Sequence, residues 1–346
     1  MNRSWEEVFL ENCGPDRLKF LSSCSAAALL PLSTLYVTSI WSFFKKKKIF
    51  HPLFSFCFIV LLTLYFFSST FLALRNATFS MYGDNYDKMD SLANTIIAYS
   101  ERFYMAINFF IPPIIAIGII ERLIATTLSQ SYEKSRPWML LGFGLVIASV
   151  LVYIEFSYRH DFNSTISTRI QVLFAILCSF SLLLLLSANI SKSKKGKANS
   201  ALSERYQVNE NLKALKIQIP IVCIDTGIQI MFLCSDVSLN VGQVLDLNKC
   251  YDDELYLNKF GAFRLIGFTF QYFIPLIVLV HFSPFCCYAI RRGPSKRQCG
   301  VSPSQEAPNG TSVITIRNAF GVPISGAEFG RAGQDAHFKN LHAQWN

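Results

Sequence analysis

Seven long stretches of apolar residues follow one another along the chain, separated by polar gaps. Each stretch holds 18 to 26 residues, and an α-helix of ~20 residues crosses the hydrocarbon core of a bilayer. Their apolar side chains surround each helix on all sides, which a soluble domain does not require. The pattern therefore predicts an all-α membrane protein, a bundle of seven transmembrane helices. The predicted spans are Phe20–Phe44, Ile49–Leu74, Phe103–Ile120, Pro137–Ile154, Ile170–Ser191, Ile217–Ser235 and Leu265–Ile290.

Positive charge is concentrated in every second gap. Of the 32 Lys and Arg residues, 21 lie in the gaps after the first, third and fifth spans and in the C-terminal tail. Lys45–Lys48, directly after the first span, is the densest group. Because positively charged loops stay in the cytosol, we expect the N-terminus outside and the C-terminus in the cytosol. The net charge of +9 then faces anionic lipid and does not indicate nucleic-acid binding.

The same pattern divides the chain into three parts. Residues 1–19 form a predicted extracellular N-terminus, and residues 20–292 form the seven-transmembrane domain. Residues 293–346 are rich in Gly, Pro, Ser and Asn and lack apolar periodicity, so they are predicted to be a disordered cytosolic tail. Two glycosylation sequons, at Asn76 and Asn163, fall in gaps assigned to the outside, where glycans can be attached.

The cysteines near the spans suggest two modifications. Cys13 and Cys250 lie in outer, oxidising segments and are predicted to form a disulfide. Cys234, near the outer end of the sixth span, is an alternative partner for Cys250. Cys286 and Cys287 lie beside the inner membrane face and suit S-palmitoylation, with packing at the end of the span as the alternative.

Catalysis has little support in the sequence. A zinc site needs about three converging protein ligands. His51 and His281 come near a span, but no HExxH-like spacing occurs. No nucleophile elbow or phosphate-binding glycine loop is present either. We therefore expect no enzyme activity, no metal and no cofactor.

Few ionisable residues interrupt the spans. Asp225 lies within the sixth span, and Glu101 and Arg102 lie near the outer end of the third. An ionisable side chain at membrane depth marks a candidate functional site. The alternatives are that Asp225 hydrogen-bonds to a neighbouring helix and that Glu101 and Arg102 lie at the membrane interface.

The cytosolic segments favour a receptor. Glu121 and Arg122 form an acid–base pair at the inner end of the third span. Such a pair can hold helix ends together and release the Arg to a partner when the helices move. The alternative is an ordinary charged end of a span.

A helical stripe precedes the sixth span. Val208, Leu212, Leu215 and Ile219 recur at spacings of four, three and four, which predicts one amphipathic face. The sixth helix is therefore expected to continue into the cytosol, with Pro220 as a kink near the membrane face.

These two inner segments carry a resemblance to a known family. Residues 121–138, ERLIATTLSQSYEKSRPW, and residues 203–211, SERYQVNEN, resemble the nematode serpentine chemoreceptors of class epsilon, the Sre family. The Ile-Phe-His-Pro sequence at residues 49–52 is similar to that family as well. Sister classes of the Sra superfamily, including alpha and beta, share parts of the Arg-Tyr-Gln…Glu-Asn pattern.

The resemblance implies a G-protein-coupled receptor at the plasma membrane of a sensory neuron, expected in its cilium, that senses a small environmental molecule. Expected partners are this ligand, a heterotrimeric G protein and membrane lipid, with a second receptor copy as a further candidate. The expected coupling residues are Glu121, Arg122, Tyr132, Arg205, Tyr206, Gln207, Glu210 and Asn211. The expected ligand-pocket residues are Glu101, Arg102, Tyr104, Asn108, Asp225, Gln271 and Tyr272. The alternative function is a seven-span ligand-gated ion channel with inverted topology, or a transporter.

Overall fold

The computed structural model covers the helices and parts of the segments that connect them. The described residues are 14–46, 50–82, 91–128, 138–158, 164–195, 202–241, 245, 249, 253, 255–282, 316–317 and 323–324.

Seven long helices account for nearly all of the described residues, which confirms the predicted all-α bundle. They are α2 (Pro15–Lys46), α3 (Pro52–Tyr82), α4 (Ser91–Thr127), α6 (Trp138–Tyr158), α7 (Ser164–Lys195), α8 (Leu202–Leu239) and α10 (Tyr256–Phe282). Within the described ranges, all of these except α6 are long and apolar enough to cross a membrane. The 21 residues of α6 also have the length of a span.

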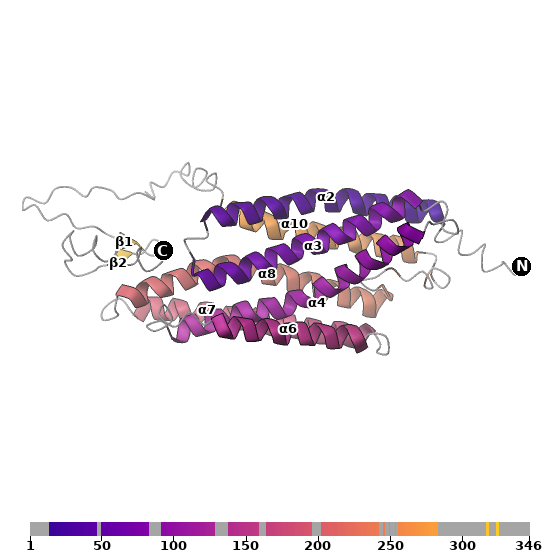
Figure 1. Cartoon of the computed structure of the whole chain (residues 1–346). Helices are drawn as coiled ribbons and strands as arrows, with labels where there is room; N and C mark the ends of the chain where they lie inside the picture. The colour runs from indigo at the N-terminus through magenta and orange to yellow at the C-terminus, as the bar shows by residue number, and fades with distance from the viewer. Residues whose placement is uncertain are drawn as a thin grey trace, which may run out of the picture.

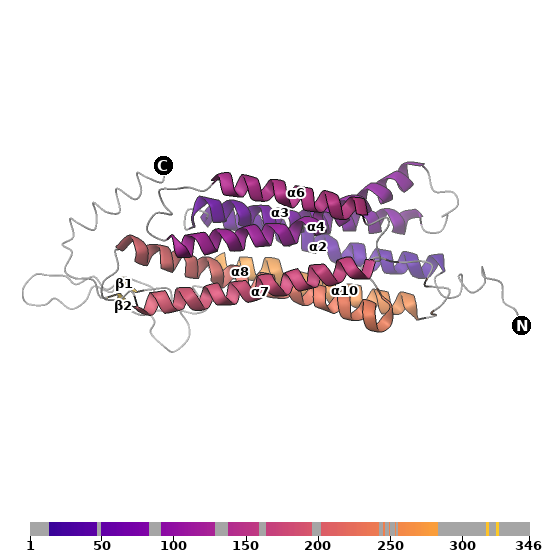
Figure 2. The same cartoon turned by 90° about the horizontal axis from the view of Figure 1, so that it is seen from below.

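The helices run in alternating directions and lie side by side (Figures 1 and 2). Contacts connect α2 to α3, α3 to α4, α4 to α7, α7 to α8, α8 to α10 and α10 back to α2, so these six form a closed ring. Helix α4 also contacts α8, and α6 packs on the outside of α4. We call the end where α2, α4, α7 and α10 terminate the inner end, because the charge distribution assigns it to the cytosol.

Several helices are longer than the apolar stretches that predict them. Helix α3 continues to Tyr82, α4 begins at Ser91, and α10 begins at Tyr256. Hydropathy detects the part of a helix that suits lipid, whereas the backbone hydrogen bonds continue past that part into polar sequence. Asn76, which the sequence places in the gap after the second span, accordingly lies inside α3.

Helix α8 is one continuous helix from Leu202 to Leu239, as the stripe predicts. Val208, Leu212 and Leu215 are all buried. The helix ends where Asn240 adopts a left-handed backbone conformation with φ of 53°, which Asn tolerates better than most residues. The next N–H, of Val241, donates to the Ser235 carbonyl at 3.1 Å and closes the last turn.

Prolines interrupt the backbone hydrogen-bond pattern of four helices. Pro112 and Pro113 lie inside α4, and Figures 1 and 2 both show α4 changing direction along its length. Pro220, where the sequence predicts a kink, lies inside α8. A proline inside a helix removes one N–H donor and its ring crowds the preceding turn, so these positions suit bends.

Apolar side chains fill the bundle and also cover its outside. At the inner end, stacked and edge-on rings join α2, α3 and α10 through Phe43, Phe50, Phe58 and Phe282. Large apolar side chains on α7, such as Leu173 at 60% exposure, point outward. Exposed apolar surface of this extent suits lipid. In the predicted tail, two-residue strands β1 (Ile316–Arg317) and β2 (Pro323–Ile324) pair antiparallel; the rest of the tail lies outside the described residues.

Candidate functional site

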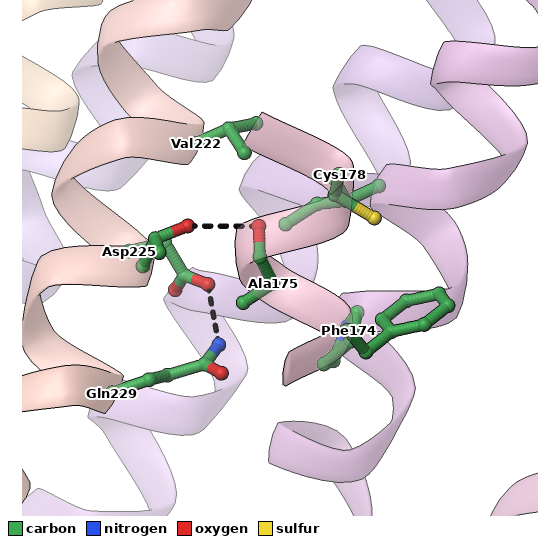
Figure 3. Close-up of a pocket in the computed structure, with 9 residues that line it drawn as sticks. Phe174, Ala175, Cys178, Val222, Asp225 and Gln229 are labelled. Atoms are coloured by element: carbon green, nitrogen blue, oxygen red, sulfur yellow. Dashed lines mark hydrogen bonds between the residues drawn. The ribbon is translucent and has the colours of Figure 1, made fainter. Parts of the chain in front are cut away.

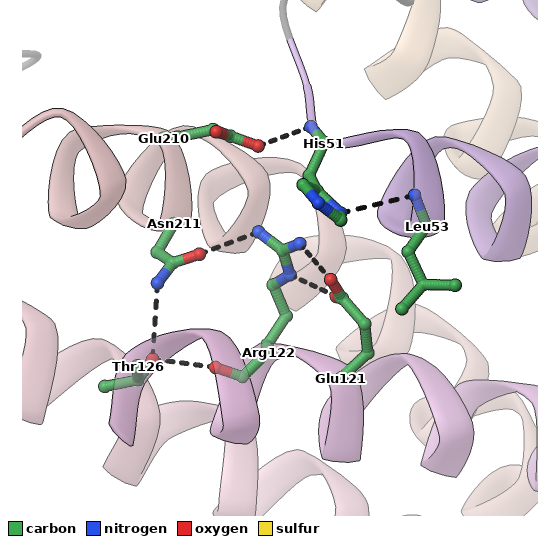
Figure 4. Close-up of polar contacts among 7 residues, drawn as sticks. All are labelled: His51, Leu53, Glu121, Arg122, Thr126, Glu210 and Asn211. Carbon is green, nitrogen blue, oxygen red and sulfur yellow. Dashed lines mark hydrogen bonds and ion pairs between the residues drawn. The ribbon is translucent and has the colours of Figure 1, made fainter. Parts of the chain in front are cut away.

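A buried polar cluster lies at the inner end of the bundle, and we call it the Arg122 cluster. Figure 4 shows the Arg122 side chain between the Glu121 carboxylate and the Asn211 amide. The cluster joins residues from the start of α3 and from α4, α7 and α8. Its members are His51, Glu121, Arg122, Thr126, Asn189, Lys192, Glu210 and Asn211.

Arg122 is the centre of this cluster. Its Nε donates to Glu121 at 2.5 Å, and its Nη2 donates to the other carboxylate oxygen of Glu121. Its Nη1 donates to Asn211 Oδ1 on α8 at 2.8 Å. The guanidinium also lies over the Phe54 ring of α3, 4.6 Å from its centroid. Arg122 and Glu121 are each 1% exposed, so a protein partner cannot touch the guanidinium in this conformation.

The neighbouring Thr126 extends the cluster to α7. Its hydroxyl donates to the Arg122 carbonyl at 2.7 Å and accepts from Asn189 at 3.0 Å. Lys192 donates from its Nζ to the Thr126 carbonyl at 2.5 Å. These bonds satisfy polar groups at the end of α4 and hold the inner end of α7 against it.

Glu210 connects α8 to the start of α3. Its carboxylate accepts a hydrogen bond from the backbone N–H of His51, and His51 Nδ1 accepts from the Leu53 N–H at 3.4 Å. Both Glu210 and His51 are buried. Since Asn211 binds Arg122 and Glu210 binds the start of α3, neighbouring residues of α8 fix its inner end to two different helices.

A small pocket lies midway along the bundle between α4, α7 and α8, and we call it the Asp225 pocket (Figure 3). Its free volume of about 10 Å³ holds roughly one water-sized group, which is far below the roughly 300–1,000 Å³ of sites for drug-sized ligands. The lining residues are Pro112, Ile115, Phe174, Ala175, Cys178, Val222, Asp225, Thr226 and Gln229.

The Asp225 carboxylate is held by two neutral donors. The Tyr65 hydroxyl of α3 donates to Oδ1 at 2.8 Å, and Gln229 Nε2 donates to Oδ2 at 2.8 Å. The Tyr65 ring stacks on Tyr36 of α2 with 5.9 Å between centroids. The Tyr36 hydroxyl in turn donates to the backbone carbonyl of Gln271 on α10 at 3.4 Å. A polar chain therefore runs from the pocket through α3 and α2 to α10.

Arg264 forms a further buried site, and the sequence analysis did not single out this residue. It is 8% exposed within α10, and its Nη1 donates to the Tyr104 hydroxyl at 3.3 Å. Its guanidinium lies 5.7–5.8 Å from the centroids of four aromatic rings, which belong to Tyr104, Phe232, Phe260 and Phe268. Aromatic residues repeating around this Arg were the signal in the sequence, because a cation is stabilised over aromatic faces.

The structure separates the predicted pocket residues. Asp225 lines the Asp225 pocket, whereas Glu101 pairs with Arg75 at 3.2 Å. Arg102 is exposed, and Tyr104 contacts Arg264. The remaining predictions lie on other helix contacts: Asn108 accepts from Ser68, the Gln271 carbonyl accepts from Tyr36, and Tyr272 donates to the Ala28 carbonyl.

Of the predicted coupling residues, four meet in the Arg122 cluster: Glu121, Arg122, Glu210 and Asn211. Gln207 lies on α8 one turn before Glu210 and Asn211, and it is buried at 1% exposure. The backbones of Arg205 and Tyr206 belong to α8, but their side chains lie outside the described residues. Tyr132, Cys13, Cys250, Asn163, Cys286 and Cys287 also lie outside the described residues.

The Asn76 side chain is 8% exposed. Glycosylation of Asn76 stays a prediction. Cys234, the alternative partner of Cys250, is described as a free, exposed cysteine.

A bundle of membrane-length helices, with a buried ionic cluster joining their inner ends, defines a seven-helix membrane protein. The family model for the Sre G protein-coupled chemoreceptor matches residues 19–284, so the chain belongs to this family and is a chemosensory receptor. The chain is also similar to Serpentine receptor class beta-16 of Caenorhabditis elegans, with 24% identity over 339 residues that cover 90% of each chain. No solved structure matches the chain.

Proposed function

We propose that this chemoreceptor binds a small environmental molecule inside the helix bundle and activates a heterotrimeric G protein at its inner end. The ligand site is the Asp225 pocket, and the switch is the Arg122 cluster. Helix α8 connects the two, because Asn211 and Asp225 lie on it 14 residues, or ~21 Å, apart. Pro220 lies between them and allows the two halves of α8 to bend relative to each other.

The observation that carries the proposal is the burial of Arg122. In this conformation its guanidinium is bound to Glu121 and Asn211 and is closed to a partner. Moving the inner half of α8 away from α4 would break the Asn211 bond and open the space between the helices. Arg122 would then face the cytosol together with Arg205 and the Tyr206–Asn211 segment, which supplies a surface for the G protein.

The placement of the receptor follows from its charge pattern and its family. We place the N-terminus outside and the C-terminus in the cytosol, at the plasma membrane of a sensory neuron and in its cilium. Within the superfamily we assign the chain to class epsilon because of the 121–138 and 203–211 segments. The Cys13–Cys250 disulfide, a glycan on Asn163 and palmitoylation of Cys286 and Cys287 belong to this proposal, as does association of two receptor copies.

Basal G-protein activation in cells tests the switch. Asn211→Ala removes the bond between α8 and Arg122 but leaves Arg122 paired with Glu121. Hydrogen bonds to charged groups contribute about 1.5–3 kcal/mol, so we expect basal activation to rise by up to about tenfold to a hundredfold. Unchanged basal activation at normal surface expression would contradict the proposed restraint.

Removal of Arg122 tests the G-protein contact. Arg122→Ala is expected to abolish G-protein signalling while surface expression is preserved. The single change leaves Glu121 as a buried charge, which costs about 3–5 kcal/mol, so the double variant Glu121→Gln/Arg122→Ala accompanies it. Glu121→Gln alone is the control and is expected to retain signalling. Full signalling by the double variant would remove Arg122 from the mechanism.

A further inference from the structure

We infer that the Asp225 pocket selects a small protonated amine, with Asp225 as the group that binds the ammonium. This inference rests on the proposed function and specifies its ligand. Asp225 is 9% exposed, and none of the nine residues that line the pocket is a Lys or Arg. An ionisable side chain at membrane depth marks a candidate ion or ligand site, and the described hydrogen-bond partners of Asp225, Tyr65 and Gln229, are both neutral.

The pocket offers acceptors in the number that an ammonium group requires. A primary ammonium has three N–H donors and no acceptor. Each Asp225 oxygen accepts one described hydrogen bond and has a second lone pair. Gln229 Oε1 is buried and has no hydrogen-bond partner among the described residues. The Thr226 hydroxyl, 2.8 Å from the Ser179 hydroxyl and 3.3 Å from the Ala175 carbonyl, is a third oxygen in the lining.

The rest of the lining favours an organic cation over a bare metal ion. Figure 3 shows Phe174, Ala175 and Cys178 of α7 across the pocket from Asp225 and Gln229. Pro112, Ile115 and Val222 complete an apolar wall, which suits a hydrocarbon chain and provides no oxygen ligands from its side chains. The free volume of about 10 Å³ holds roughly one water-sized group, which is the size of an ammonium head, and it excludes large ligands.

Binding there would act directly on the packing of α3 and α8. The Tyr65–Asp225 hydrogen bond is a buried polar link between these helices. An ammonium that draws the Asp225 carboxylate toward α7 weakens this link. Because the same two helices meet again at His51 and Glu210, a shift of α8 at the pocket reaches the Arg122 cluster along one rigid element.

Thermal unfolding of the purified full-length receptor tests this inference without a G protein. The probes are butylamine and two compounds of the same chain length, butanol and butyrate. A ligand that binds the folded state raises the melting temperature as its concentration rises. We expect butylamine to raise it, and butanol and butyrate to have little effect because they lack the ammonium.

Two pocket variants and one matched control locate the effect. Asp225→Asn keeps the shape and the contacts to Tyr65 but removes the charge, so the apparent affinity for butylamine should fall about 10- to 100-fold. Gln229→Met removes the second acceptor and should weaken binding several-fold. Asp253→Asn makes the same chemical change in the outer segment before α10 and should leave the butylamine response intact.

Each other result overturns the inference. Equal stabilisation by butanol would show a purely apolar pocket. Stabilisation by sodium chloride but not choline chloride, lost in Asp225→Asn, would show an inorganic cation site. No butylamine response in the unmodified receptor, or an unchanged response in Asp225→Asn, would remove Asp225 as the binding group. Because the Arg122 experiments use basal activation, they decide the proposed switch independently of these results.

Discussion

Arg264 and Arg102 show how strongly the surroundings decide the role of a charged side chain in this bundle. The sequence placed Arg102 near the outer end of the third span, and Arg264 directly precedes the seventh predicted span. Arg264 turns inward among four aromatic rings and binds the Tyr104 hydroxyl, whereas Arg102 is exposed on α4. Aromatic faces stabilise a cation by about 0.5–2 kcal/mol each, so Arg264 contributes to packing as well as to charge.

Truncation of Arg264 tests this packing role. Arg264→Ala opens a cavity between α4, α8 and α10 and leaves the Tyr104 hydroxyl without its donor. We expect the folded state to lose about 2–4 kcal/mol of stability, measured as a lower melting temperature of the purified receptor. Phe103→Ala is the control, because Phe103 is 53% exposed. Equal melting temperatures for the Arg264→Ala variant and the unmodified receptor would contradict the packing role.

Asp253 stabilises the start of α10 from outside the membrane. Its carboxylate accepts from the Leu255 N–H at 2.9 Å and from Lys259 Nζ at 2.6 Å. The hydrogen bond from Lys259 holds the Asp253 pKa below its ordinary value. A lowered carboxyl pKa stabilises the folded state above the ordinary value, and this contribution is lost as the pH falls through the lowered pKa.

The lowered pKa of Asp253 predicts how the stability of an Asp253 variant depends on pH. At neutral pH, Asp253→Asn should melt at a slightly lower temperature than the unmodified receptor, because the ion pair with Lys259 is exposed and weak. The difference should disappear once the pH falls below the lowered pKa, where Asp253 itself is protonated. A difference that is the same at neutral and acidic pH would show that the carboxylate charge is not its cause.

Among the helices, α4 has contacts on the most sides. It packs against α3, α6, α7 and α8, and glycines permit two of these contacts. A Cβ added at Gly118 would lie 3.2 Å from Gln218 Nε2 on α8, and one at Gly144 on α6 would lie 3.1 Å from Ile117 on α4. Small residues at such crossings let membrane helices approach closely. The distance between α4 and α8 at Gly118 in turn positions Arg122 against Asn211.

A larger side chain at Gly118 tests whether the crossing of α4 and α8 requires a small residue. Gly118→Leu should push α8 away from α4 and destabilise the receptor by about 1–3 kcal/mol through overpacking. Gly142→Leu on α6 is the matched control, since nothing lies within 4 Å of a Cβ built there. The melting temperatures of the two variants give the comparison. Equal melting temperatures would show that the crossing tolerates a side chain.

The alternating direction of seven helices puts the start of α2 and the end of α10 at opposite ends of the bundle (Figure 1). The chain is an integral, multi-pass membrane protein, and the charge distribution orients it with the N-terminus outside. The channel alternative has the opposite orientation. The topology therefore distinguishes two whole-molecule mechanisms without any knowledge of the ligand.

Glycosylation tests this orientation. Asn163 precedes α7 at the end of the bundle that we assign to the outside, so glycosidase treatment should increase the gel mobility of the receptor from cells. Asn163→Gln should abolish the change. An N-terminal tag reached by antibody only after permeabilisation would contradict the orientation and favour the inverted channel topology.

The sequence was most informative where one helix alone carries the signal. The seven apolar stretches, the stripe through Val208 and Leu212, and the Glu121–Arg122 pair are local patterns, and each has a counterpart in the structure. Contacts between different helices could not be predicted from such local patterns. The pairing of Asp225 with Tyr65, of Glu210 with the His51 backbone and of Arg264 with aromatic rings depends on how each helix is rotated about its axis.

The sequence by itself determined that the chain is a seven-helix membrane protein, because lipid requires long apolar helices and the cytosol retains positive loops. Its resemblance to a receptor family lies in residues 121–138 and 203–211. Tertiary structure alone decided which polar residues meet. Residues 65 and 225, or 51 and 210, are far apart in the chain, and hydropathy carries no information about their mutual approach. Packing of side chains between helices brings them together, so the pocket and the switch exist only in the folded bundle.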